Sequence, residues 1–269
     1  MRIDPSFFST EKPFLISGPC VAESLDLCLE VAETMASVCA KRGIPYIFKA
    51  SFDKANRTSL NSARGKGLEK GLEILEQVKR SLGLPVLTDV HESWQLPYLQ
   101  QVVDVIQIPA FLCRQTDLLV EAGKTNCHLN IKKGQFLSPD DMGFVVEKTG
   151  RIDGSCWLTE RGTTFGYRDL VVDFRGVERM KKWGPVVFDA THSVQSPGGR
   201  NGQSGGEREM AVVLAKAASA LGVHGFFMET HPTPDQAMSD AANTLPLAAM
   251  PDVLDMVLEV YSRTPLPDL

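Results

Sequence analysis

Eight short apolar runs along this chain each lead to a residue suited to chemistry. Tyr46-Ile47-Phe48 stops at Lys49, and Val86-Leu87 leads to Asp89 and His91. The other six runs lead to Cys20, to Gln107, to Lys132, to Glu160 and Arg161, to Asp189 and His192, and to Glu229. In a closed barrel of parallel strands, the carboxyl ends of all the strands surround one mouth, and active sites lie there. The pattern therefore predicts a barrel and indicates which of its ends is functional.

Segments with helical periodicity separate these runs. Within residues 25–41, Leu27, Val31 and Met35 recur at helical spacing, and Gly43 ends the pattern. Further helices are expected over 68–82, 94–101, 115–124, 138–148, 177–183, 207–221 and 244–262. Strands that alternate with helices predict the α/β class and a (β/α)8 TIM barrel. The alternative is an open doubly wound sheet, which would gather ligand residues at one switch point.

Length and composition fit one globular unit. The chain has 269 residues, 43% apolar and 23% charged, without a linker or a composition break, so we expect a single barrel catalytic domain over residues 1–269. Apolar stretches stay well below the ~18 residues of a membrane span, and the N-terminal residues lack a signal-peptide pattern. A cytoplasmic protein without membrane association is expected. Its six cysteines are then buried thiols rather than disulfides.

Charge is distributed in a way that favours small anionic ligands. A net charge of −5 argues against nucleic-acid binding but allows a local cationic pocket. Residues 49–59 contain Lys49, Lys54 and Arg57 together with three hydroxyl side chains. A second cationic set follows the fifth and sixth runs: Lys132, Lys133 and Arg161. Arg and Lys in loops after strands suit phosphate and carboxylate groups, so two sets indicate two anionic substrates or one with two anionic ends. The alternative is a solvated charged face.

Another set of residues has the chemistry of metal ligands. Cys20, His192 and Glu229 follow the first, seventh and eighth runs, which are neighbours in a closed barrel, and Asp240 lies in the next loop. A thiolate, an imidazole and two carboxylates suit Zn²⁺, Fe²⁺, Mn²⁺ or Co²⁺, and ligand type does not choose among them. Taken alone, Cys20 reads as a small buried apolar residue and His192 as a hydrogen-bonded core histidine.

Two further features bear on the mouth. Asp89 and His91 lie two residues apart, so both side chains can serve acid–base chemistry or orient other groups. Residues 196–206 are rich in glycine and follow His192 closely, which indicates either a lid over the mouth or a long surface connection. Nucleotide-binding and serine-hydrolase motifs are missing from the sequence.

Long motifs in this chain resemble those of the 3-deoxy-D-manno-octulosonate 8-phosphate synthase family. The most specific reads Phe-Lys-Ala-Ser-Phe-Asp-Lys-Ala-Asn-Arg-Thr-Ser at 48–59. Others lie at 88–92, 107–117, 132–136, 160–167, 189–195 and 228–232, so the resemblance covers nearly the whole chain. It implies a transferase that condenses phosphoenolpyruvate with arabinose 5-phosphate and water in lipopolysaccharide core synthesis. It also implies a (β/α)8 barrel and a homo-oligomer, usually a tetramer.

The resemblance also implies roles for individual residues. The phosphoenolpyruvate carboxylate and phosphate would be held by Lys49, Lys54, Lys132 and Arg161, with Ser51 and Gln107 nearby. The sugar phosphate would be held by Asn56, Arg57 and Thr58, with Arg114 from a neighbouring subunit. The catalytic group would comprise Lys54, Asp89, His91, Lys132 and His192. The family more often has Ser at position 58, and Thr keeps the hydroxyl.

Metal dependence divides the family into two branches. The metal-independent branch has Asn where this chain has Cys20, and the segment from Gln195 to Gly199 also resembles the metal-dependent branch. The implied ligands are Cys20, His192, Glu229 and Asp240. Three alternatives remain at this point: a heptulosonate-phosphate synthase that uses erythrose 4-phosphate, a metal-dependent sugar-phosphate aldolase, and a non-catalytic sugar-phosphate sensor.

Overall fold

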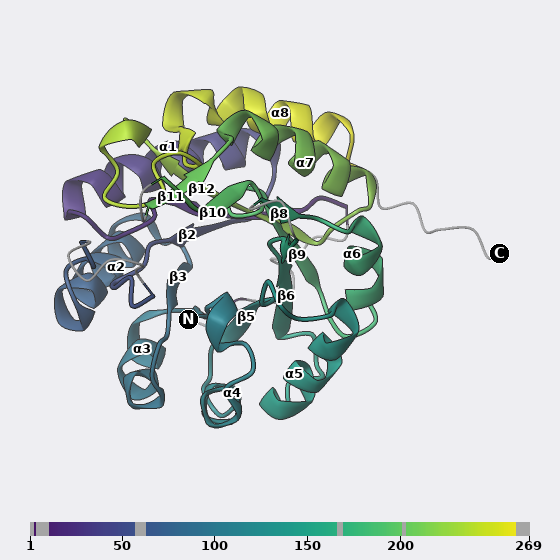
Figure 1. The fold of residues 1–269 in the computed structure, drawn as a ribbon. Helices are drawn as coiled ribbons and strands as arrows, with labels where there is room; N and C mark the ends of the chain where they lie inside the picture. The colour runs from purple at the N-terminus through teal and green to yellow at the C-terminus, as the bar shows by residue number, and fades with distance from the viewer. Residues whose placement is uncertain (1–2, 4–10, 57–62, 166–168, 201–202, 262–269) are drawn as a thin grey trace.

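The computed structural model describes residues 3, 11–56, 63–165, 169–200 and 203–261. Within them the apolar runs are parallel strands with these bounds: β1 Phe14–Gly18, β2 Tyr46–Lys49, β3 Val86–Asp89, β4 Val105–Ile108, β5 His128–Lys132, β6 Cys156–Glu160, β9 Val186–Asp189 and β12 Gly225–His231. They pair in chain order, and β12 pairs back with β1, Phe227 opposite Ile16, which closes the sheet (Figure 1). The predicted (β/α)8 barrel is confirmed, and the open sheet is wrong.

Helices surround the barrel on its outer side (Figure 1). Their bounds are α1 Leu25–Arg42, α2 Leu68–Leu82, α3 Leu96–Val102, α4 Thr116–Gly123, α5 Met142–Thr149, α6 Phe174–Met180, α7 Arg208–Ala220 and α8 Met250–Glu259. The helix expected over 177–183 begins earlier because the Asp173 side chain accepts a hydrogen bond from the backbone N–H of Arg175 and caps it. The helix expected over 244–262 begins later, because Leu245–Pro246 pairs with β12 as strand β13. No helix in the described ranges is long and apolar enough to cross a membrane.

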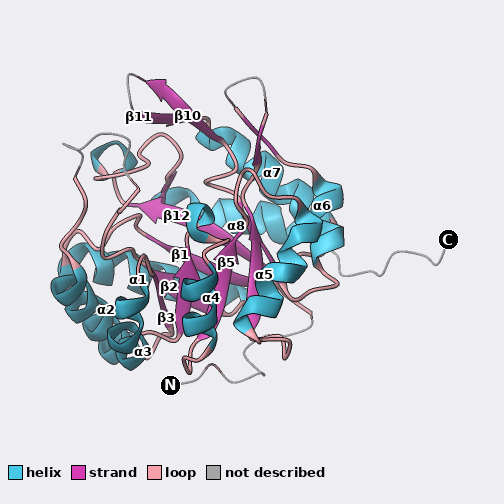
Figure 2. Cartoon of the chain, turned by 60° about the horizontal axis from the view of Figure 1, so that its bottom comes forward, coloured by secondary structure: helices cyan, strands magenta, loops and turns pink. Residues whose placement is uncertain are grey.

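The segment that follows His192 is a hairpin. Strand β10, Gln195–Arg200, pairs antiparallel with β11, Gln203–Gly206, and Figure 2 shows the pair projecting from the body of the barrel. A second short pair joins β7, Thr163–Thr164, to β8, Leu170–Val171. The region expected to be a lid or a surface connection thus has regular structure over most of its length.

Alternation along the strands separates an apolar floor from a polar mouth. The floor is a buried cluster inside the barrel: Ile3, Phe14, Ile16, Ile47, Leu87, Val105, Trp157, Val187 and Phe227. Phe14 and Trp157 pack with ring centroids 4.8 Å apart, and removal of the Trp157 ring would cost about 3–5 kcal/mol. Because side chains alternate with period two, the next inward positions on the strands are Lys49, Asp89, Gln107, Asp189 and Glu229. The barrel therefore presents charged and amide groups directly above its apolar floor.

Candidate active site and metal centre

Three of the four expected metal ligands, Cys20, Glu229 and Asp240, meet at one side of the mouth, and the fourth, His192, lies next to them. We call these four residues the metal corner. Ligand atoms of Cys20, Glu229 and Asp240 lie within 4.8 Å of one another, and the Cys20 thiol donates to Asp240 Oδ2 at 3.0 Å. Asp240 has a φ of 53°, in the left-handed region that few non-glycine residues adopt and in which Asp is enriched. Gly18 allows the close approach of the neighbouring strand, because a Cβ there would lie 2.0 Å from the Lys49 carbonyl oxygen.

Glu229 has one paired and one unpaired carboxylate oxygen within the described part of the chain. Its Oε1 accepts from Lys49 Nζ at 2.5 Å, whereas its buried Oε2 has no hydrogen-bond partner among the described residues. His192 Nε2 lies 3.8 Å from that oxygen, outside the tight group of three. His192 Nδ1 lies 2.8 Å from Asp189 Oδ2, and in the neutral imidazole, with Nδ1 as the donor, Nε2 offers its lone pair to a cation. An unpaired carboxylate oxygen beside a thiol and an imidazole fits a divalent cation.

The protonation of the metal corner also fits a cation site. Burial, and then the charge of Glu229, raise the pKa of the Cys20 thiol. Burial raises the pKa of Asp240, but His192 and Lys54 outweigh it, so this pKa lies well below its usual range. A divalent cation would reverse the effect on the thiol and bind it as the thiolate. Binding of a metal should therefore release a proton.

An anion-binding set lies beside the metal corner. Lys132 Nζ donates to Asp189 Oδ2 at 2.7 Å and lies 3.8 Å from the centre of the Phe227 ring. Arg161 Nη2 donates to Gln195 Oε1 at 2.6 Å, while its buried Nη1 has no partner among the described residues. Burial lowers the pKa of Lys132 and that of Arg161, although acidic neighbours raise both. Buried cationic donors with unused capacity suit a carboxylate or a phosphate.

Lys54 and Lys133 behave differently from each other. Burial lowers the pKa of Lys54, but Cys20, Glu229 and further acidic neighbours outweigh it, so the pKa is raised and the ammonium stays charged beside the metal corner. Lys133 does not join the anion-binding set. Its Nζ lies 3.5 Å from Glu160 Oε2 and 3.1 Å from Thr163 Oγ1, because adjacent residues on a strand face opposite ways. The expectation that Lys133 serves an anionic ligand is wrong.

Opposite the metal corner lies a polar row. It consists of Ser51, Asp89, Gln107, Asn130 and Thr159, all of them buried and linked by hydrogen bonds. Two of these, Asn130 and Thr159, were not expected from the sequence. The signal that could have found them is alternation, since they lie two residues before Lys132 and Arg161 and so face the same interior.

His91 lies beside the polar row. Its ring packs edge-on against Phe52, with centroids 5.3 Å apart, and its buried Nδ1 has no partner among the described residues. Burial lowers the pKa of His91 despite the charge of Asp89. The imidazole is therefore neutral near pH 7 and can accept a proton.

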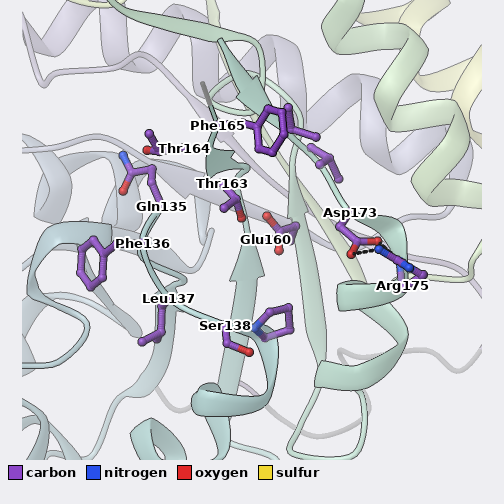
Figure 3. A pocket seen from close by; sticks show the side chains of 13 residues that line it. Gln135, Phe136, Leu137, Ser138, Glu160, Thr163, Thr164, Phe165, Asp173 and Arg175 are labelled. Atoms are coloured by element: carbon purple, nitrogen blue, oxygen red, sulfur yellow. Dashed lines mark hydrogen bonds and ion pairs between the residues drawn. The ribbon is translucent and has the colours of Figure 1, made fainter. Parts of the chain in front are cut away.

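The residues expected to hold a sugar phosphate are only partly described. Asn56 lies in an exposed turn, and Arg57 and Thr58 lie outside the described residues. Arg114 is exposed after β4, so its expected contribution to a neighbouring subunit stays a prediction. A cavity of about 850 Å³ lies beside the mouth, between the loops that follow β5 and β6, and Figure 3 shows the ion pair of Asp173 and Arg175 at its side. None of the expected site residues that the structure describes lines it.

Comparison with known proteins places this chain in a family. The model described as the DAHP synthetase I family matches residues 9–264. Proteins named 2-dehydro-3-deoxyphosphooctonate aldolase are similar throughout. The protein from Thioalkalivibrio sulfidiphilus is 55% identical over 243 residues (90% of this chain, 87% of the relative). Those from Synechococcus sp. (56% over 249 residues; 91% and 87%) and Syntrophobacter fumaroxidans (50% over 254 residues; 94% and 88%) agree with it. The chain therefore belongs to the DAHP synthetase I family.

Proposed function

We propose that this chain condenses phosphoenolpyruvate with D-arabinose 5-phosphate and water to 3-deoxy-D-manno-octulosonate 8-phosphate and inorganic phosphate. The observation that carries the proposal is that one mouth holds a buried guanidinium nitrogen of Arg161 and a buried carboxylate oxygen of Glu229, neither of which has a hydrogen-bond partner among the described residues. One suits an anionic substrate and the other suits a cation. The names of the relatives point to the same eight-carbon acid phosphate, which belongs to lipopolysaccharide core-sugar synthesis.

The proposed reaction forms one carbon–carbon bond and one carbon–oxygen bond, and it breaks one carbon–oxygen bond. C3 of the enol attacks the aldehyde carbon while water adds at C2. The aldehyde oxygen gains a proton and the attacking water loses one. The tetrahedral C2 then expels phosphate by cleavage of its bond to the bridging oxygen, and the C2 hydroxyl gives its proton to the departing phosphate as the ketone forms.

The cations at the mouth orient and neutralise the substrates. Lys132 and Arg161 bind the carboxylate and phosphate of phosphoenolpyruvate, with Lys49 and Lys54 beside them. Fixing two anions in attack geometry converts binding energy into proximity and removes their mutual repulsion. His91 is neutral, and its Nδ1 has no partner within the described part of the chain, so it is suited to accept the proton that the attacking water loses.

A divalent metal fits the metal corner. Cys20, His192, Glu229 and Asp240 would hold Zn²⁺, Fe²⁺, Mn²⁺ or Co²⁺ there. When bound, the metal would act as a Lewis acid toward the aldehyde or the water, or would position them. The chain's own part is to keep the Cys20 thiol and the Glu229 carboxylate buried, so that both prefer a cation to water.

The sugar-phosphate site of this chain is proposed to lie between two subunits of an oligomer. Asn56, Arg57 and Thr58 bind the aldose phosphate, helped by Arg114 of a neighbouring subunit in a homotetramer. Residues 1–269 act as one catalytic domain in the cytoplasm. Arg114 is exposed and follows β4 closely, which leaves it accessible to a second copy.

A phosphate-release assay tests the proposal. Release should require both phosphoenolpyruvate and arabinose 5-phosphate, with kcat/KM at least tenfold lower for erythrose 4-phosphate. A preference for erythrose 4-phosphate would establish the heptulosonate synthase instead. Turnover of a single sugar phosphate without phosphoenolpyruvate would indicate an aldolase.

A further inference from the structure

The polar row has a single direction of donation. Thr159 Oγ1 donates to Asn130 Oδ1 at 2.6 Å, and Asn130 Nδ2 donates to Gln107 Oε1 at 2.9 Å. Gln107 Nε2 then donates to Asp89 Oδ1, and Ser51 Oγ donates to Asp89 Oδ2. These side chains are between 0% and 6% exposed, so water does not compete for the bonds. The row spans the wall from the end of β2 to β6.

The Asp89 carboxylate sets that direction. An ionised carboxylate only accepts hydrogen bonds, so the NH₂ group of Gln107 must face it. Gln107 Oε1 then faces Asn130, which must present its own NH₂ group, and Asn130 Oδ1 is left to accept from Thr159. Burial raises the pKa of Asp89, but the charges of Lys54 and Lys49 outweigh it, so the group stays ionised. The orientations of both amides follow from one charge.

We propose that Asn130 and Thr159 are positioning residues that fix the carboxamide of Gln107 for phosphoenolpyruvate. This inference rests on the proposed function. Gln107 Nε2 carries two N–H groups, and among the described residues only Asp89 uses one of them, so the second is available to the substrate anion. Asn130 and Thr159 reach the substrate only through Gln107.

The cost of breaking the row explains why Thr159 matters. Without its hydroxyl, Asn130 Oδ1 becomes a buried acceptor without a donor, which is unfavourable. The Asn130 amide can then rotate without losing a hydrogen bond to Thr159. Once it rotates, its NH₂ group no longer donates to Gln107 Oε1. Because buried polar networks specify one arrangement only when every member is satisfied, the Gln107 amide would sample both orientations.

Two substitutions test the proposal. Thr159→Val keeps the shape and removes the donor, and should raise both KM and the calorimetric Kd for phosphoenolpyruvate about fivefold. Asn130→Asp can accept from Thr159 but cannot donate to Gln107, and should raise both values by more than tenfold. In each variant the KM for arabinose 5-phosphate should change less than twofold, which a general loss of structure would not produce.

Two controls separate positioning from packing. Thr159→Ser keeps the hydroxyl and should restore both values to within twofold of the parent. Thr88→Val removes a hydroxyl that donates to the Ala50 carbonyl oxygen at 2.8 Å, buried but outside the row, and should leave them unchanged. The inference is overturned if Thr159→Val has the same KM and Kd for phosphoenolpyruvate as the parent, or if Thr88→Val raises these values as much as Thr159→Val does. Calorimetry measures the binding of phosphoenolpyruvate alone, so it tests the role of Asn130 and Thr159 without requiring turnover. The proposed function is tested separately, and it is contradicted if the parent protein releases no phosphate.

Discussion

The two sides of the barrel mouth differ in how completely their buried polar atoms are paired. In the polar row, Asp89, Gln107 and Asn130 satisfy one another across neighbouring strands. In the metal corner, Glu229 Oε2 has no hydrogen-bond partner among the described residues, and Cys20 holds a proton that burial makes hard to lose. We call the polar row the closed side, because each of its side chains has a hydrogen-bond partner and, within the described part of the chain, one N–H of Gln107 is left for a ligand, and we call the metal corner the open side.

This difference separates support from binding. A buried polar atom without a partner costs free energy, so it persists where a ligand completes it. A fully paired network costs less and fixes orientation, which suits groups that hold other groups in place. The same contrast predicts different consequences when each side is perturbed.

The largest expected effect is on the open side. Removal of bound metal with a chelator should lower the rate of phosphate release on the order of 10²–10³-fold, because a Lewis acid contributes several kcal/mol. Return of one equivalent of Mn²⁺, Co²⁺ or Zn²⁺ should restore it. Full activity in protein without metal, as measured by elemental analysis, would remove the metal from the account.

On the closed side, the expected effect is on stability. The pKa of Asp89 lies below its ordinary value, so the ionised group contributes stability above about pH 4 that is lost as the pH falls through the folded pKa. Asp89→Asn should lower the free energy of unfolding by about 3 kcal/mol at pH 7. In urea denaturation, the difference in free energy of unfolding between this variant and the parent, which we call the gap, should decrease as the pH is lowered. A gap that widened in acid would contradict the closed network.

A third prediction concerns the anion-binding set between the two sides. Arg161→Lys keeps the charge but loses the planar fork, and should raise the KM for phosphoenolpyruvate about tenfold to a hundredfold. Steady-state kinetics should show little change for the aldose phosphate. Arg80→Lys, at an exposed arginine on α2, is the matched control and should not alter either value. Equal effects from both substitutions would argue against an anion site at Arg161.

The smallest effect is expected from a thiol outside the mouth. Cys28 is buried in the packing of α1, and burial raises its pKa to about 12, as expected of an inert core thiol. Cys28→Ala should cost about 1 kcal/mol of stability and leave metal content unchanged. Loss of metal in this variant, measured by elemental analysis, would contradict the assignment of Cys28 as a core thiol without a part in metal binding.

Local pattern was enough to predict the barrel and much of its mouth. Apolar runs that end in Lys49, Asp89 or Glu229 are strands that present those residues at their carboxyl ends. Period-two alternation and the order of strands around a barrel are fixed by backbone geometry, so neighbours such as Cys20 and Glu229 could be named without coordinates.

The features that the sequence did not predict depend on contacts between residues that are distant along the chain. Lys133 was grouped with Lys132 by proximity in sequence, although its side chain faces Glu160. Asn130 and Thr159 have meaning only through the Asp89 carboxylate, whose charge depends on lysines from another strand and loop. No local rule predicts such a chain of donors, because its direction is set at one end.

The most direct test is to titrate Co²⁺ into metal-free protein and measure thiolate-to-cobalt absorption. We expect one Co²⁺ per chain, with a charge-transfer band that Cys20→Ser abolishes and Asn130→Asp retains. Cobalt binding without this band, or a band that survives in Cys20→Ser, would contradict the assignment of the open side as the metal centre.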